Sequence, residues 1–131
     1  MDHHAPDLTT QVLNATEGRG PDIIIEMLAN TNLARDLGML AHRGRVVVIG
    51  NRGTIEINPR DAMSKDASIH GMLLLNTTPE ETLRIVAGLK AGLKNKTLNP
   101  VIGKQFALAE APQAHEAVLA PGAFGKIVLV P

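Results

Sequence analysis

The fold is decided by two runs of β-branched residues, Asp22-Ile23-Ile24-Ile25-Glu26-Met27-Leu28 and Arg45-Val46-Val47-Val48-Ile49-Gly50. Neither run alternates apolar with polar residues, a pattern typical of parallel strands that are covered on both faces. Between them, apolar residues at helical spacing predict a helix near residues 31–42, capped by Asn30-Thr31-Asn32 and ended by Arg43-Gly44. Strand, helix and strand over about 30 residues have the size of a β-α-β unit, so the sequence predicts a parallel sheet.

Further elements are expected on either side of this unit. The apolar residues that follow Asp7 fit a helix over residues 8–15, with Asp7 as its N-cap. Residues 54–57 alternate as in a short strand, which Asn58-Pro59 would stop. Residues 68–75 form another candidate strand, so three or four strands are expected in this part of the chain.

The remainder of the chain reads as helix, strand, helix and strand. Thr78-Pro79-Glu80-Glu81 supplies an N-cap, a first-turn proline and a glutamate at the third helical position, and therefore opens a helix. A strand near residues 101–108, a helix near residues 110–119 and a terminal strand over residues 126–130 complete the pattern. The fold class predicted from the residues is α/β.

Composition excludes several kinds of function. The 131 residues include no cysteine, which rules out disulfides, cysteine-ligated zinc and a thiol nucleophile. Thirteen basic residues balance 13 acidic ones, and Phe106 and Phe124 are the only aromatics, so both charge and stacking argue against nucleic-acid binding. No apolar run approaches the roughly 20 residues that cross a bilayer, and no signal-peptide pattern opens the chain, so we expect a cytoplasmic protein.

Ligands of open parallel sheets bind beyond the carboxyl ends of the strands. Three such segments are expected here, at residues 28–32, 50–53 and 74–78. In Gly50-Asn51-Arg52-Gly53, the glycines allow a ligand close to the backbone and the guanidinium could grip a phosphate or carboxylate. The alternative is a tight turn with a solvated arginine. The sequence contains no G-x-G-x-x-G motif and no phosphate-binding P-loop.

The titratable residues give little indication of a catalytic or metal-binding site. Glu26 lies in an apolar strand, where it either faces a cleft or pairs with a cation such as Arg45. The histidines include no H-x-x-x-H pair, only the adjacent His3-His4 at the N-terminus, so no metal site is expected. Hydride transfer remains compatible with this sequence, because in such enzymes the cofactor carries the reactive atom.

A resemblance to a known family is carried by Gly20-Pro21-Asp22-Ile23-Ile24-Ile25-Glu26-Met27-Leu28-Ala29-Asn30 and by Gly44-Arg45-Val46-Val47-Val48-Ile49-Gly50-Asn51-Arg52-Gly53-Thr54-Ile55-Glu56-Ile57-Asn58-Pro59-Arg60. The resemblance is a close one, to the zeta-crystallin family of NADPH-dependent quinone oxidoreductases. It continues through Asn99-Pro100-Val101-Ile102-Gly103, Ala114-His115-Glu116 and Gly125-Lys126, and so covers essentially the whole chain.

The resemblance implies the C-terminal portion of a zinc-free medium-chain dehydrogenase/reductase. Residues 1–75 then correspond to the second half of a Rossmann cofactor-binding domain, a partial Rossmann-like parallel sheet with helices. Residues 76–131 correspond to a strand-helix-strand segment that returns to the GroES-like catalytic domain. The glycine-rich turn and the substrate domain of such enzymes have no counterpart here, so we expect little or no turnover from this chain alone.

The resemblance also implies a cofactor, a substrate and contact residues. NADPH would pass a hydride to a quinone, and the family's NADPH contacts fall on Asn32, Ile49, Gly50, Asn51, Arg52, Met72, Leu73 and Leu74. No catalytic side chain and no metal ligand is implied. The strand at residues 68–75 would be the sheet edge through which such enzymes form homo-oligomers.

Two other readings remain open at this stage. The chain could be a noncatalytic module that binds a nucleotide or mediates oligomerisation. RNA binding is implied only by the resemblance, and the neutral charge and scarcity of aromatics argue against it.

Overall fold

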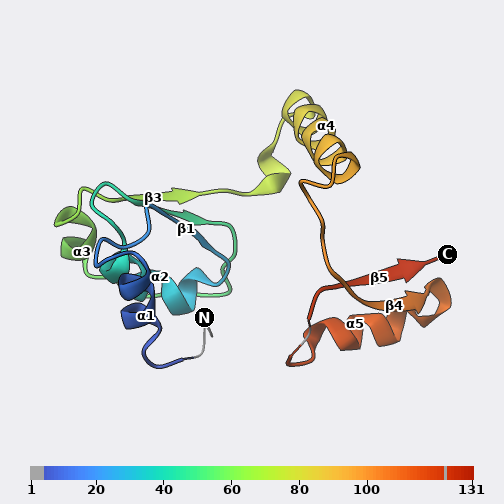
Figure 1. The fold of residues 1–131 in the computed structure, drawn as a ribbon, viewed down its shortest axis with the longest axis horizontal. Helices are drawn as coiled ribbons and strands as arrows, with labels where there is room; N and C mark the ends of the chain where they lie inside the picture. The colour runs from blue at the N-terminus through green and yellow to red at the C-terminus, as the bar shows by residue number, and fades with distance from the viewer. Residues whose placement is uncertain (1–4, 123) are drawn as a thin grey trace. The chain divides into compact units, whose positions relative to one another are not determined.

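A computed structural model describes residues 5–122 and 124–131 of the chain (Figure 1). These residues belong to two compact units, Met1–Asn76 and Thr77–Pro131. Among the described residues, no helix is both long enough and apolar enough to cross a membrane. Each unit contains its own parallel sheet. The sequence predicts the parallel sheet of the first unit.

The first unit is a three-stranded parallel sheet in the order β1-β2-β3. Its elements are α1 (Leu8–Ala15), β1 (Ile23–Glu26), α2 (Ala29–Met39), β2 (Arg45–Val48), α3 (Pro59–Met63), β3 (Ser68–Gly71) and the 3-10 turn η1 (Leu74–Asn76). In the register, Glu26 lies beside Val48, and Val48 lies beside Gly71. The three carboxyl ends therefore meet at one edge of the sheet.

The core of this unit lies between α2 and one face of the sheet. Leu37, Leu40 and Val46 are almost completely buried, and side chains from β1, β2 and α3 pack around them. The ammonium group of Lys65 donates to the carbonyl oxygens of Gly38 and Leu40, at 2.5 and 2.7 Å. A cation at this end of α2 also suits the helix dipole, so the helix is fixed by its apolar face and by its C-terminus.

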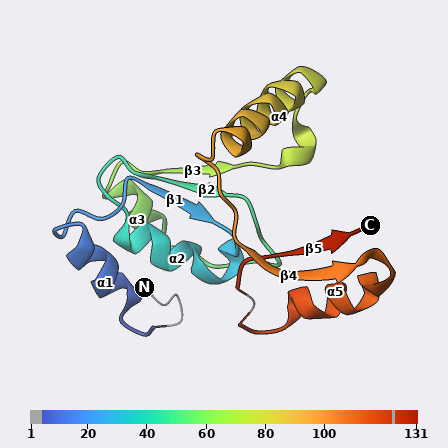
Figure 2. The same ribbon diagram turned by 45° about the vertical axis from the view of Figure 1, so that its right-hand side comes forward.

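The strands are covered on one face only, which corrects the expectation of two covered faces. Ile23 and Ile25 are 46% and 65% exposed, whereas Ile24 packs on the core. The helices α1, α2 and α3 all lie on the same side of the sheet (Figure 2). Among the residues described in this unit, no helix covers the opposite face of β1, and alternate residues of the apolar run stay exposed.

The start of α2 also differs from the prediction. The helix begins at Ala29 with Leu28 as its N-cap, and no side chain caps it. The asparagines expected as caps, Asn30 and Asn32, lie inside the first turn and bond to other segments. The asparagine side chains therefore form hydrogen bonds, but to Glu26 and to the Arg52 amide rather than to the start of the helix.

The predicted strand at residues 54–57 is wrong. This segment forms no strand, although Ile57 packs against the core cluster. Both edges of β2 are already occupied by β1 and β3, so an alternating segment after β2 finds no free partner there. Asn58-Pro59 opens α3 instead of only stopping a strand: the side chain of Asn58 accepts a hydrogen bond from the Arg60 amide at 3.0 Å.

The second unit contains the two-stranded parallel sheet. Its elements are α4 (Pro79–Lys94), β4 (Ile102–Ala107), the 3-10 turn η2 (Leu108–Glu110), α5 (Ala111–Leu119) and β5 (Lys126–Val130). The capping box predicted at Thr78 and Glu81 is present, with both of its hydrogen bonds formed. The strand-helix-strand order predicted for this part of the chain is confirmed.

Truncating the most deeply buried leucine tests the core assignment. Leu37 is 0% exposed, so Leu37→Ala should lower the free energy of unfolding by about 2–5 kcal/mol in urea titrations, because it removes buried methyl groups and leaves a cavity. Leu75 is 88% exposed, and Leu75→Ala should change the same quantity by less than about 0.5 kcal/mol. Equal losses in the two variants would contradict the core described above.

Candidate functional site at the carboxyl edge of the sheet

Backbone hydrogen bonds join the first two carboxyl ends directly. The carbonyl oxygen of Glu26 accepts from the amides of Ile49 and Gly50, at 2.9 and 3.2 Å, and the Ala29 amide donates to the Gly50 carbonyl at 3.0 Å. A Cβ added to Gly50 would lie 2.0 Å from the carbonyl oxygen of Met27. Only glycine therefore permits this close approach of the two segments.

The side chain of Glu26 makes a second set of bonds at the same place. Glu26 is only 6% exposed. Its Oε1 accepts a hydrogen bond from the backbone amide of Leu28 and another, at 3.1 Å, from Nδ2 of Asn32. The proposed partner Arg45 is wrong, since Arg45 lies beside Ile23 at the amino end of the strand. Neutral donors, rather than a cation at the opposite end, satisfy this carboxylate.

A second buried carboxyl group lies against Glu26. Asp36, on α2, is 1% exposed, and its side chain is hydrogen-bonded to that of Glu26. Burial, the hydrogen bond to Glu26 and the charge of Glu26 raise the pKa of Asp36 to about 7, against an opposing effect of Arg35. Burial also acts to raise the pKa of Glu26, but the hydrogen bonds from Asp36, Leu28 and Asn32 and the charge of Arg35 outweigh it and lower that pKa.

The loop after β2 is fixed by an asparagine from the first turn of α2. Oδ1 of Asn30 accepts from the backbone amide of Arg52 at 2.9 Å, and Nδ2 of Asn51 donates to the Gly53 carbonyl at 2.7 Å. The Arg52 side chain is exposed, and among the described residues it forms no ion pair. The loop is therefore an ordered turn that presents a guanidinium group to solvent.

The third carboxyl end contributes apolar side chains. The Met72 amide donates to the Val48 carbonyl at 2.9 Å, which extends the β2–β3 ladder by one bond. Met72, Leu73 and Leu74 are 48%, 57% and 59% exposed. Exposed apolar residues thus follow β3 at the same edge of the sheet as Glu26.

The structure brings most of the sequence-predicted contact residues together. Asn32, Ile49 and Gly50 each bond to Glu26, and Arg52 is held by Asn30. Sequence reasoning missed Asn30 and Asp36. The sequence predicts a helix cap at Asn30. The signal that could have identified its other role is its position in the helical turn that follows the carboxyl end of β1, where side chains lie near the ligand edge.

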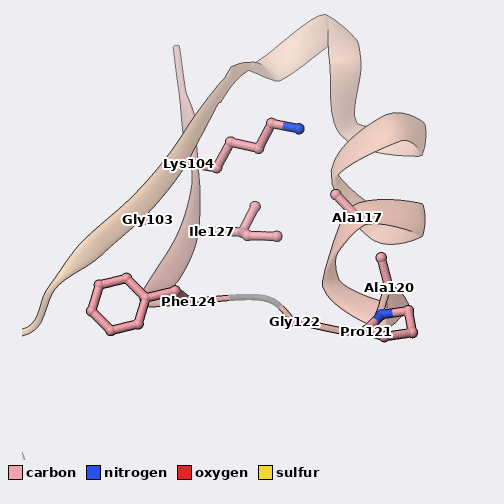
Figure 3. A pocket seen from close by; sticks show the side chains of 8 residues that line it. All are labelled: Gly103, Lys104, Ala117, Ala120, Pro121, Gly122, Phe124 and Ile127. Carbon is pink, nitrogen blue, oxygen red and sulfur yellow. The ribbon is translucent and has the colours of Figure 1, made fainter.

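A separate pocket lies in the second unit. It has a volume of about 440 Å³ and is lined by residues of β4, α5 and β5 and of the segment that follows α5 (Figure 3). Lys104 is the charged side chain of this lining, and its Nζ lies 4.9 Å from the centroid of the Phe106 ring. None of the predicted cofactor contacts lines this pocket.

Comparison with known proteins assigns the family. The family model described as zinc-binding dehydrogenase matches residues 1–129. The chain belongs to this family. It is 52% identical to a human quinone oxidoreductase over 113 residues, 86% of this chain and 34% of that protein. It is 45% identical to a pig quinone oxidoreductase over 131 residues, 99% of this chain and 40% of that protein.

The fold also matches solved dehydrogenase structures. Mycobacterial Rv1454c in complex with NADPH superimposes with a TM-score of 0.79 and 23% identity, over 99% of this chain and 42% of that one. The predicted resemblance to quinone oxidoreductases and the α/β fold class are confirmed. The chain spans 34% and 40% of the length of the two quinone oxidoreductases it matches.

The residues present do not fit the zinc centre that the family description implies. The sequence has no cysteine, and the described residues include no group of three or more His, Asp or Glu side chains that could hold a metal ion. His3 and His4 lie outside the described residues.

The raised pKa of Asp36 predicts a pH-dependent stability. Its ordinary value is 3.8 and its folded value about 7, so between these limits the folded state binds more protons than the unfolded state. The free energy of unfolding should fall as pH rises from 5 to 7, by at most about 1.4 kcal/mol per pH unit, and level off above pH 8. The lowered pKa of Glu26 acts in the opposite direction only at more acidic pH.

Urea denaturation between pH 5 and 8 measures this dependence. Asp36→Asn should remove the decline, because an amide cannot lose the proton. Asp22→Asn, at the exposed amino end of β1, should retain it. A stability that is flat across this range in the unaltered chain would contradict the assignment.

Proposed function

We propose that the chain forms one half of the cofactor cleft of an NADPH-dependent quinone oxidoreductase. The proposed NADPH contacts are Asn32, Ile49, Gly50, Asn51, Arg52, Met72, Leu73 and Leu74. Residues 1–75 act as the second half of a Rossmann domain, and residues 76–131 as the returning segment of the GroES-like domain. NADPH, when bound, supplies the hydride that reduces a quinone.

One observation carries this proposal. Glu26 ties Asn32 after β1 to Ile49 and Gly50 after β2, through its side chain and its carbonyl oxygen respectively. Proposed contacts from the first turn of α2 and from the segment after β2 are thus held in one arrangement, at the edge where parallel sheets bind nucleotides. The identity to quinone oxidoreductases and the fold shared with an NADPH-bound structure support the same assignment.

The side chains at this edge suit a nucleotide cofactor. Asn32 donates one N–H to Glu26 and accepts from Arg35 at 2.9 Å, which leaves its second N–H and a lone pair for a ligand. The exposed guanidinium of Arg52 can bind a phosphate or a carboxamide oxygen. The apolar residues Met72 to Leu74 can exclude water from the reacting atoms.

These residues provide few contacts for the pyrophosphate of the cofactor. The sequence has no G-x-G-x-x-G turn, the motif that places a pyrophosphate at a helix N-terminus. We therefore propose that NADPH binds weakly to this chain and that quinone turnover by the chain alone is little or none.

Calorimetric titration with NADPH tests the contacts. We expect saturable binding that Arg52→Ala weakens by about tenfold, since a hydrogen bond to a charged group contributes about 1.5 kcal/mol. Arg84→Ala, which removes an exposed guanidinium from α4, is the matched control and should bind as the unaltered chain does. No binding up to millimolar NADPH, or an equal loss in both variants, would refute the proposed contacts.

A second function, self-association, rests on a different observation. β3 is an edge strand of its sheet, all four of its residues are exposed, and its Ile69 is 42% exposed. An exposed edge strand offers unpaired backbone groups to which a strand of another chain can bond. We propose that the segment at residues 68–75 joins copies of this chain into a homo-oligomer.

Light scattering measures this association. The unaltered chain should have the mass of a dimer or a larger oligomer, and Ile69→Lys should shift it toward 13.9 kDa, because a charge on the edge opposes strand pairing. Leu83→Lys, on the exposed surface of α4, is the control and should leave the mass unchanged. A monomeric unaltered chain would contradict the proposed interface.

A further inference from the structure

The Glu26–Asp36 contact lies directly behind the proposed cofactor edge. Glu26 is the last residue of β1, and Asp36 lies on α2, which packs on that strand. The two residues are 6% and 1% exposed, and their carboxyl groups are hydrogen-bonded to each other. Two carboxyl groups can share a hydrogen bond only if one of them carries a proton.

The surrounding donors show which carboxyl group holds that proton. Glu26 accepts hydrogen bonds from the Leu28 amide and from Asn32, so it is solvated by the protein as an anion. Oδ2 of Asp36 is buried, and among the described residues no donor reaches it. A charge on Asp36 would be unsolvated, whereas a proton on Asp36 lets it donate to Glu26.

The other charged groups near the pair do not replace this proton. Arg35 is the one cation that acts on both carboxyl groups within the described part of the chain, and it bonds to Asn32. On the remaining elements packed around α2, α1 has no charged residue, Arg45 of β2 acts on Asp22, and Asp61 of α3 acts on Lys65.

We infer that Asp36 is a positioning residue, which donates a proton to Glu26 and thereby holds Asn32 and the turn after β1 in the arrangement proposed to bind NADPH. This role toward the cofactor rests on the proposed function. Loss of the proton would place two buried anions in contact, and the repulsion is relieved when Glu26 and Asp36 separate. Such a separation moves Asn32, because Asn32 bonds to Glu26 and lies on the same helix as Asp36.

NMR of the full chain observes this coupling without any cofactor. The Asn32 side-chain amide and the Leu28 backbone amide both donate to Glu26, so both signals should shift together between pH 5.5 and 8.5, with a common midpoint near 7. In Asp36→Asn the amide donates permanently, so both signals should stay fixed over this range. Asp22→Asn should retain the unaltered titration.

A second variant keeps the test decisive if Asp36→Asn does not fold. Glu26→Gln removes the anion that Asp36 contacts, so the carboxyl carbon of Asp36 should titrate below its midpoint in the unaltered chain, although burial still raises its pKa. Signals of Asn32 and Leu28 that do not move in the unaltered chain, or that titrate alike in Asp36→Asn, would overturn the inference.

NADPH affinity measures the functional consequence. With a midpoint near 7, about 90% of Asp36 is protonated at pH 6 and about 10% at pH 8, so apparent affinity should fall by up to about tenfold between them. Asp36→Asn should lack this fall, and it also corrects for titration of the cofactor's own phosphate.

The two failures are distinguishable. Absence of NADPH binding in both proteins at both pH values would refute the proposed function, while the NMR titration still decides the role of Asp36. Binding with the same pH dependence in both proteins would refute the inference and leave the proposed function standing.

Discussion

The carboxyl edge of the sheet depends on the bonds of one residue, Glu26. Its carbonyl oxygen accepts two amides from the end of β2, and its carboxylate accepts from Leu28 and Asn32. Burying a carboxylate in an apolar strand is costly unless hydrogen-bond donors surround it. The donors to the Glu26 carboxylate come from Leu28 and Asn32, which belong to the turn that forms the proposed site. The requirement to satisfy Glu26 and the requirement to position the cofactor loops are therefore met by the same hydrogen bonds.

Close packing of the two backbones restricts which residue can stand at the end of β2. At Gly50, any side chain would meet the Met27 carbonyl, so the ends of β1 and β2 can approach only because this residue is glycine. Farther out, Asn30 crosses to the Arg52 amide and orders the loop without a regular element. The guanidinium group that we propose to bind NADPH is thus supported by the first turn of α2, although it belongs to the loop after β2.

Local patterns in the sequence predict those features that depend on neighbours along the chain. The β-branched runs at residues 22–28 and 45–50 predict the parallel strands, and Thr78 with Glu81 predicts the capping box. Features set by distant partners could not be derived in this way. The strand expected at residues 54–57 fails because β2 has no free edge. Asp36 looks like an ordinary helical acid until the fold places it against Glu26.

Amide hydrogen exchange on Glu26→Ala tests most directly whether this residue organises the edge. We expect faster exchange, by a similar factor, at four amides: that of Leu28, which bonds to the Glu26 side chain, those of Ile49 and Gly50, which bond to its carbonyl oxygen, and that of Arg52, which bonds to Asn30. Ala67 and Arg43, whose amides bond to the carbonyl oxygens of Ala62 and Lys65, should keep their rates. Faster exchange at Leu28 alone would mean that the Glu26 carboxylate holds only its own turn, and would contradict a single organised edge.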